Sequence, residues 1–210
     1  MPLLLGALLL VWAAMLVLGG SDPDKAALLF LYAGDRPGLV DAARAVTALG
    51  SYPVLIGLTL LGVAGLALRR DWRGALLLIA ITLSGRLLVQ LQKDWTGRLR
   101  PEDQEHLVAT QSYAFPSGHA ANAMLVLLSL ALLLPASARG RRLAVAAAAI
   151  ASIAVGLSRP ILGVHWPSDV VAGWALGLFW TLLFLRLSGR RSGGGTAPAP
   201  RPDPGEEERS

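Results

Sequence analysis

The sequence predicts an all-α protein built as a bundle of six transmembrane helices, and two observations support this fold class. First, 54% of the 210 residues are hydrophobic and only 16% are charged, whereas soluble domains carry about 25% charged residues. Second, six apolar runs alternate with polar connections, at residues 2–19, 53–68, 75–91, 119–134, 143–157 and 170–187. Since a membrane-spanning helix needs about 20 mostly apolar residues, we expect the bilayer to surround most of the chain.

The six runs differ in how well they fit a spanning helix. The third and sixth are long enough, whereas the second, fourth and fifth must borrow flanking residues. The fifth is the weakest, because residues 143–157 cover only about 22 Å as a helix. Either the arginines at its start reach outward, or its far end stops below the membrane surface. The first run lacks both the positive start of a signal peptide and a clear cleavage site, so we expect a retained helix.

Two of the stretches outside the apolar runs bear on the domain organisation. Within the polar connection at residues 20–52, the segments 26–32 and 39–49 could form short helices at the membrane interface or belong to a plain surface loop, and the sequence leaves both open. Residues 189–210 are rich in Gly, Pro, Ser and charge, a composition that cannot build a core. We therefore expect one domain at residues 1–188, followed by a disordered cytoplasmic tail at residues 189–210.

The charge of the chain indicates a membrane topology. The net charge is +5, but the arginines stand at the ends of apolar runs and form no basic stripe, so we do not expect a nucleic-acid partner. Three clusters follow the second, fourth and sixth runs: Arg69, Arg70 and Arg73; Arg139, Arg141 and Arg142; Arg186, Arg190 and Arg191. The positive-inside rule puts these connections, and with them both termini, in the cytoplasm. The absence of cysteine excludes disulfides and thiolate metal sites.

Chemically reactive side chains gather in three segments that the six-span count places on the opposite, extracytoplasmic side. Polar residues that a membrane chain concentrates at one depth are functional candidates. The candidates are Lys93, Arg100, Ser117, Gly118, His119, Arg159, His165 and Asp169.

The first group of candidates is suited to holding phosphate. Arginine forks bind phosphate oxygens through two hydrogen bonds, and lysine adds a point charge. Ser117 precedes a predicted helix, where it would act as the N-cap, and a helix N-terminus favours an anion. Gly118 would let the backbone approach that anion closely.

The second group is suited to nucleophilic and proton-transfer chemistry. His165 and Asp169 are four residues apart, so on a helix they share a face. The carboxylate could then fix the tautomer of the imidazole and leave its other nitrogen free to attack. With His119 as a second proton-transfer group, the set is sufficient for phosphoryl transfer without a metal.

These segments resemble the three-part motif of the type 2 phosphatidic acid phosphatase (PAP2) superfamily. The motif positions are Lys93, six residues, Arg100-Pro101; then Pro116-Ser117-Gly118-His119; then Ser158-Arg159, five residues, His165, three residues and Asp169. All three parts are intact and in order, and they extend from the third apolar run to the sixth. The resemblance implies a helical bundle, six-spanning in the membrane members, with its active site on the extracytoplasmic side.

The resemblance also implies a role for each candidate. The histidine that matches His165 attacks phosphorus and forms a phosphohistidine, the aspartate that matches Asp169 assists it, and the histidine that matches His119 protonates the leaving group. The phosphate-binding positions are matched by Lys93, Arg100, Ser117, Gly118 and Arg159. No cofactor or metal is implied. The implied partners are a lipid phosphate substrate and the bilayer, and the implied location is the inner (cytoplasmic) membrane, with the active site facing the periplasm or the cell exterior.

The expected function is that of a lipid phosphatase acting on undecaprenyl diphosphate, phosphatidic acid or phosphatidylglycerophosphate, with a weak preference for the polyprenyl diphosphate. One alternative is a phosphotransferase that passes the phosphoryl group to a sugar or lipid hydroxyl. A second is a non-catalytic transporter or scaffold, although the presence of His119, His165 and Asp169 together disfavours it. A vanadium haloperoxidase, as on the soluble branch of the superfamily, is not expected in so small and apolar a chain.

Several conspicuous side chains have simpler interpretations. Taken alone, Lys93 and Arg100 could be interfacial anchors. Trp95 and Trp166 suggest an aromatic belt rather than substrate contacts. His106 and Tyr113 are expected in a solvated loop. Asn122 is expected to hydrogen-bond between helices.

Overall fold

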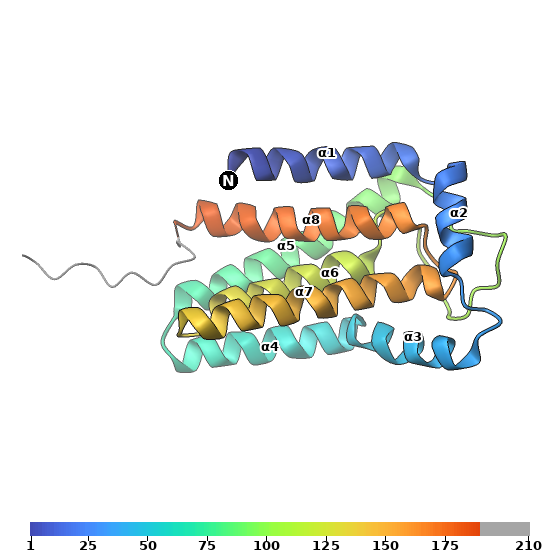
Figure 1. The fold of residues 1–210 in the computed structure, drawn as a ribbon. Coiled ribbons are helices and arrows are strands. Elements are labelled where there is room, and N and C mark those ends of the chain that lie inside the picture. Colours follow the sequence, from blue (N-terminus) through green and yellow to red (C-terminus); the bar gives the residue numbers. More distant parts are fainter. Residues whose placement is uncertain (190–210) are drawn as a thin grey trace, which may run out of the picture.

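The structure, a computed structural model, describes residues 1–189, and within them every regular element is an α-helix (Figure 1). The predicted tail at residues 189–210 lies outside the described residues apart from Gly189. The helices are α1 (Pro2–Leu18), α2 (Asp22–Leu31), α3 (Pro37–Leu49), α4 (Tyr52–Leu68), α5 (Trp72–Thr96), α6 (Gly118–Leu133), α7 (Ala138–Ile161) and α8 (Pro167–Leu187). The all-α fold class is therefore confirmed.

Each of the six apolar runs forms a helix, and Figure 1 shows α1 and α4 to α8 running alongside one another. In the described part of the chain, four helical stretches are long and apolar enough to cross a membrane: α3 with α4 (Pro37–Leu68), α5, α7 and α8. The bent pair of α1 and α2 could make a fifth. The 16-residue α6 is shorter, at about 24 Å. A multi-pass membrane chain is thus supported, whereas six spans stay a prediction.

The fifth run was expected to span only by borrowing flanking residues, and the helix does extend beyond the run at both ends. Helix α7 has 24 residues, or about 36 Å. It starts early because Ser137 caps it, its hydroxyl accepting a hydrogen bond from the Gly140 amide at 3.0 Å. It also continues through Arg159 and Pro160 in its last turn. The apolar run underestimated the helix because arginines lower the hydropathy at both ends without opposing helix formation.

The segments left open in the first connection both form helices. Helix α2 bends by 93° from α1 and crosses one end of the bundle in Figure 1, where α3 continues the line of α4. The buried side chain of Asp24 fixes α2 to the start of α8, since its oxygens accept hydrogen bonds from the amide and hydroxyl of Ser168 at 2.9 and 2.6 Å. These two helices therefore cover the end of the bundle where α8 begins.

Helix α6 forms the centre of the bundle and packs against α5, α7 and α8. Its contact with α8 is close because that face of α8 carries glycine. A Cβ at Gly173 would lie 2.7 Å from the Ser117 carbonyl oxygen, and one at Gly177 would lie 2.7 Å from the Ala121 carbonyl oxygen. Small residues spaced in this way let membrane helices approach through their backbones. The N-termini of α6 and α8 are held side by side as a result, with the Ser117 amide donating to the Asp169 carbonyl at 2.9 Å.

Candidate active site

The three motif segments meet at the end of the bundle that α2 and α3 cover. They line one pocket of about 420 Å³, formed by Tyr52, Gln90, Lys93, Arg100, Ala109, Thr110, Gln111, Ser112, Gly118, His119, Arg159 and His165. Six of the eight candidate residues are in this lining, and the other two, Ser117 and Asp169, are buried. The structure therefore brings together side chains that are up to 76 positions apart in the sequence, from Lys93 to Asp169.

Two of the cations come from the end of α5 and the loop that follows. Lys93 lies in the last turn of α5 and is only 3% exposed, and its Nζ donates to the Tyr113 carbonyl. Gly97 then ends the helix in the left-handed conformation, at φ 57°, which glycine adopts readily. In the loop, the Nε of Arg100 donates to the Ser112 carbonyl at 2.8 Å and its Nη1 donates to the Val164 carbonyl. Backbone carbonyls thus hold both cations at the pocket.

The third cation comes from α7. Arg159 is only 4% exposed, and its Nη1 donates to the Thr47 hydroxyl of α3 at 2.7 Å. Its Nε is buried with no hydrogen-bond partner among the described residues. None of the residues lining the pocket is acidic. Three cations are therefore gathered without a carboxylate in the lining, which favours an anionic ligand.

The N-terminus of α6 supplies neutral donors to the same pocket. Ser117 is the N-cap residue, as predicted, but its hydroxyl makes no capping bond. That hydroxyl is buried and has no partner within the described part of the chain. A Cβ at Gly118 would be 3.7 Å from the Lys93 Cε, which is an ordinary contact. The glycine therefore leaves space in front of the helix amides rather than avoiding a clash, and an anion could occupy that space.

The connection between α7 and α8 presents His165 with a carboxylate behind it. The Nδ1 of His165 lies 3.3 Å from the Oδ2 of Asp169, and the same oxygen accepts the Trp166 amide at 3.0 Å. Pro167 starts α8 at its first turn, which places Asp169 one turn below the imidazole. Burial, together with the charges of Arg100 and Lys93, lowers the pKa of His165 well below its ordinary value of 6.5. The imidazole is thus neutral at neutral pH, and Nε2 carries a lone pair if Nδ1 donates to Asp169.

Comparison with known proteins places this arrangement in a family. The sequence model of the PAP2 superfamily matches residues 74–192, which is more than half of the chain and includes every candidate residue. The chain belongs to the PAP2 superfamily.

Individual relatives agree with this assignment. Phosphatidylglycerophosphatase B of Bacillus subtilis is 35% identical over 171 residues, which cover 79% of this chain and 80% of that protein. Decaprenylphosphoryl-5-phosphoribose phosphatase of Mycobacterium tuberculosis is 34% identical over 147 residues, 68% of this chain and 77% of that protein. The crystal structure of the transmembrane PAP2 phosphatidylglycerolphosphate phosphatase from Bacillus subtilis matches with a TM-score of 0.79 and 28% identity, over 88% of this chain and 96% of that one. The chain is accordingly a membrane phosphatase.

One residue beside the candidate site, Arg98, was not predicted from the sequence. Its Nη1 donates to the Oδ1 of Asp169 at 2.8 Å, and its Nη2 donates to the Leu16 carbonyl of α1. The guanidinium also lies 4.3 Å from the centre of the Phe115 ring. Arg98 therefore forms an ion pair with Asp169, the carboxylate that orients His165, and connects Asp169 to α1. The sequence gives no periodic signal for this contact, because the two residues are 71 positions apart.

The simpler interpretations of other side chains had mixed outcomes. His106 and Tyr113 are exposed in the loop, as expected. Trp95 is 72% exposed, and its place in an aromatic belt stays a prediction. Trp166, expected in an aromatic belt, is instead buried, and its Nε1 donates to the Leu99 carbonyl at 3.1 Å. The expected interhelical hydrogen bond of Asn122 is not present, since its Nδ2 is buried without a partner among the described residues.

Proposed function

We propose that this PAP2 protein hydrolyses the terminal phosphate of a membrane lipid through a phosphohistidine on His165, without a metal. The observation that carries the proposal is the position of His165, oriented by Asp169, in a pocket shared with Lys93, Arg100 and Arg159. A neutral imidazole faces the place where three cations would hold a phosphate. This is the arrangement that nucleophilic catalysis at phosphorus requires.

In the first half-reaction, the Nε2 lone pair of His165 attacks phosphorus. A P–N bond forms, the P–O bond to the lipid side breaks, and the Asp169 carboxylate stabilises the positive charge that develops on the imidazole. His119 donates a proton to the leaving oxygen, because a phosphate dianion favours the charged form of an imidazole beside it. The cations and the buried Ser117 hydroxyl bind the oxygens on which charge accumulates.

In the second half-reaction, His119 takes a proton from water, the water oxygen bonds to phosphorus, and the P–N bond breaks to release inorganic phosphate and free His165. Water is the preferred acceptor because both named relatives are phosphatases. The phosphotransferase alternative has no specific observation in its favour.

The names of the relatives indicate the class of substrate. A phosphatidylglycerophosphate and a decaprenylphosphoryl-5-phosphoribose both carry a terminal phosphomonoester and a second phosphate nearer the lipid chain. We propose a lipid of this kind, with phosphatidylglycerophosphate ahead of the polyprenyl diphosphate that the sequence analysis preferred. Phosphatidic acid, which has a single phosphate, is the weaker candidate.

The membrane arrangement completes the proposal. Six spans, one for each helix of the bundle, put the arginine clusters that follow α4 and α6 in the cytoplasm and the pocket at the opposite face. Both termini would then be cytoplasmic, and the site would open towards the periplasm or the cell exterior from the inner membrane. Single cysteines introduced into these connections, and labelled with a membrane-impermeant reagent on intact cells, test this orientation.

The experiment that tests the function measures phosphate release from phosphatidylglycerophosphate in detergent micelles with a metal chelator present. The wild-type chain should turn over, and His165→Ala should lose essentially all activity. His106→Ala is the matched control, because His106 is exposed outside the pocket, and it should keep the wild-type rate. A strict requirement for a divalent cation, or near-normal turnover by His165→Ala, would contradict the proposal.

A further inference from the structure

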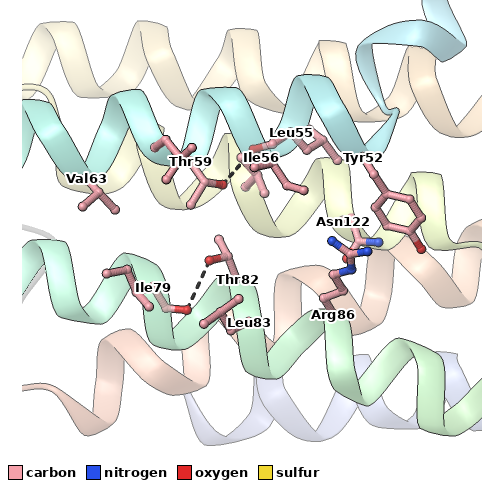
Figure 2. Close-up of a pocket in the computed structure, with 12 residues that line it drawn as sticks. Tyr52, Leu55, Ile56, Thr59, Val63, Ile79, Thr82, Leu83, Arg86 and Asn122 are labelled. Carbon is pink, nitrogen blue, oxygen red and sulfur yellow. Dashed lines mark hydrogen bonds between the residues drawn. The ribbon is translucent and has the colours of Figure 1, made fainter.

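A second cavity, outside the catalytic pocket, lies between α4 and α5 (Figure 2). It is a groove of about 310 Å³ with a mostly aliphatic lining, made of Tyr52, Leu55, Ile56, Thr59, Leu60, Val63, Ile79, Thr82, Leu83, Arg86, Asn122 and Val126. The hydroxyls of Thr59 and Thr82 are satisfied by carbonyls of their own helices. The remaining polar groups, on Tyr52, Arg86 and Asn122, gather at one end of the groove in Figure 2.

Arg86 is an unusual residue for such a groove. It lies ten residues before the end of α5, about 15 Å along the helix from Thr96, and so within the span rather than at its edge. Its guanidinium carbon stands 4.0 Å from the centre of the Tyr52 ring. Among the described residues it has no carboxylate partner within salt-bridge distance. A charge inside a span is costly and is by default functional.

The polar end of the groove adjoins the catalytic pocket. Tyr52 lines both cavities. At Gly118, a Cβ would lie 3.8 Å from the Tyr52 hydroxyl, 3.8 Å from the Asn122 Nδ2 and 3.7 Å from the Lys93 Cε. Arg86 and Lys93 are seven residues apart on α5, which puts them on one face about 10.5 Å apart. A molecule held by Lys93 could therefore extend past Gly118 to Arg86.

Asn122 adds a neutral donor at the same place. It is 5% exposed, it lines the groove, and its Nδ2 has no hydrogen-bond partner in the described residues. Buried polar groups are nearly always paired, so an unpaired amide that faces a cavity indicates a ligand acceptor. A guanidinium and an amide together are suited to the oxygens of a phosphate.

We propose that Arg86, assisted by Asn122, binds a second phosphate of the lipid substrate, while the hydrocarbon chain continues along the aliphatic groove between α4 and α5. The inference rests on the proposed function and narrows it to lipids in which the scissile phosphate and the chain are separated by another phosphate. A lipid with one phosphate would fill the catalytic pocket but leave Arg86 without an anion.

The test compares two lipids with the same acyl chains, phosphatidylglycerophosphate and phosphatidic acid, in mixed micelles, with p-nitrophenyl phosphate as a soluble substrate without a chain. The wild-type chain should show a KM about 10- to 100-fold lower for phosphatidylglycerophosphate, the value of one charge-assisted contact. Arg86→Gln should remove most of that preference and leave p-nitrophenyl phosphate turnover within about twofold of the wild type. Arg86→Lys, which keeps the charge, should restore part of the preference.

Arg73→Gln is the matched control, because Arg73 lies on the same helix in its first turn, away from both the groove and the catalytic pocket. It should leave KM and turnover unchanged for all three substrates. Equal losses for every substrate in Arg86→Gln, or no loss at all, would overturn the inference. If Arg86→Gln does not fold, the wild-type KM values decide, and equal values for the two lipids reject the second phosphate site. Failure of the wild-type chain to hydrolyse either lipid would instead reject the proposed function.

Discussion

Both ends of the helical bundle carry cations, but these are exposed at one end and buried at the other. At one end, Arg69 and Arg70 after α4 and Arg142 near the start of α7 are exposed, and Arg69 donates to the Leu134 carbonyl at 2.5 Å. At the other end, Lys93 and Arg159 are almost completely buried. The same types of residue therefore serve two purposes, and burial distinguishes them.

The difference has a physical basis. An exposed arginine at a span end remains hydrated and mainly determines orientation in the membrane. A buried cation loses its hydration, and it persists only where partners or a ligand compensate. The buried cations have carbonyl and hydroxyl partners but no carboxylate in the pocket lining. Only the end with buried cations is therefore suited to an anionic substrate.

The largest effect is expected at the carboxylate behind the nucleophile. Asp169→Asn removes the charge that stabilises the His165 imidazolium, so kcat should fall by about 10²- to 10⁴-fold. Phosphate release in micelles measures it. The control is Asp24→Asn, a buried carboxylate that anchors α2 and lies outside the pocket lining; it should lower the thermal midpoint but keep kcat. Equal losses in both variants would mean that Asp169 acts only through stability.

The next effect separates the two ends of the bundle directly. Arg159→Gln should lower kcat by about 10²- to 10³-fold, as for the loss of one donor to a charged transition state. Its thermal midpoint should stay the same or rise, because the substitution removes the desolvation cost of a buried charge. Arg142→Gln should change neither property. A clear loss of stability in Arg159→Gln would indicate that Arg159 has a structural role. The distinction between buried cations that bind substrate and exposed cations that determine orientation would then fail.

A smaller effect is expected for Arg98, which holds Asp169 from outside the pocket. Arg98→Gln removes a charge-assisted hydrogen bond to the carboxylate, which corresponds to about 10- to 100-fold in kcat. KM for p-nitrophenyl phosphate should stay within about twofold of the wild type, since Arg98 does not line the phosphate pocket. Arg44→Gln, in an exposed arginine of α3, is the control. A rise in KM without a change in kcat would reject this positioning role.

The smallest effect concerns pH. Because burial and neighbouring cations lower the pKa of His165, its neutral form should persist as the pH falls from neutral through 6.5. In a His106→Gln, His119→Gln background, acylation of His165 by diethyl pyrocarbonate should keep a nearly constant rate over that interval. A rate that halves near pH 6.5 would show that His165 has an ordinary pKa. It would reject the claim that burial and the neighbouring cations lower that pKa.

The sequence was sufficient for the six helices of the bundle and for six of the twelve residues that line the pocket, but not for the residues that support them. Hydropathy located every bundle helix because apolar runs are local, yet it shortened α7, where arginines occupy both ends. Those six lining residues all belong to the three motifs. Arg98, Thr47 and Arg86 were not identified, because their importance depends on partners that only folding brings close: Asp169, Arg159 and Tyr52.

The central claim is that His165 carries the phosphoryl group, and trapping the intermediate tests it most directly. The wild-type chain would be mixed with a lipid labelled at its terminal phosphate, quenched in base within milliseconds, digested and mapped by mass spectrometry. We predict a base-stable, acid-labile phosphate on the peptide that contains His165, and none in His165→Ala. Label on a different side chain, or turnover with no label on any residue, would contradict the account.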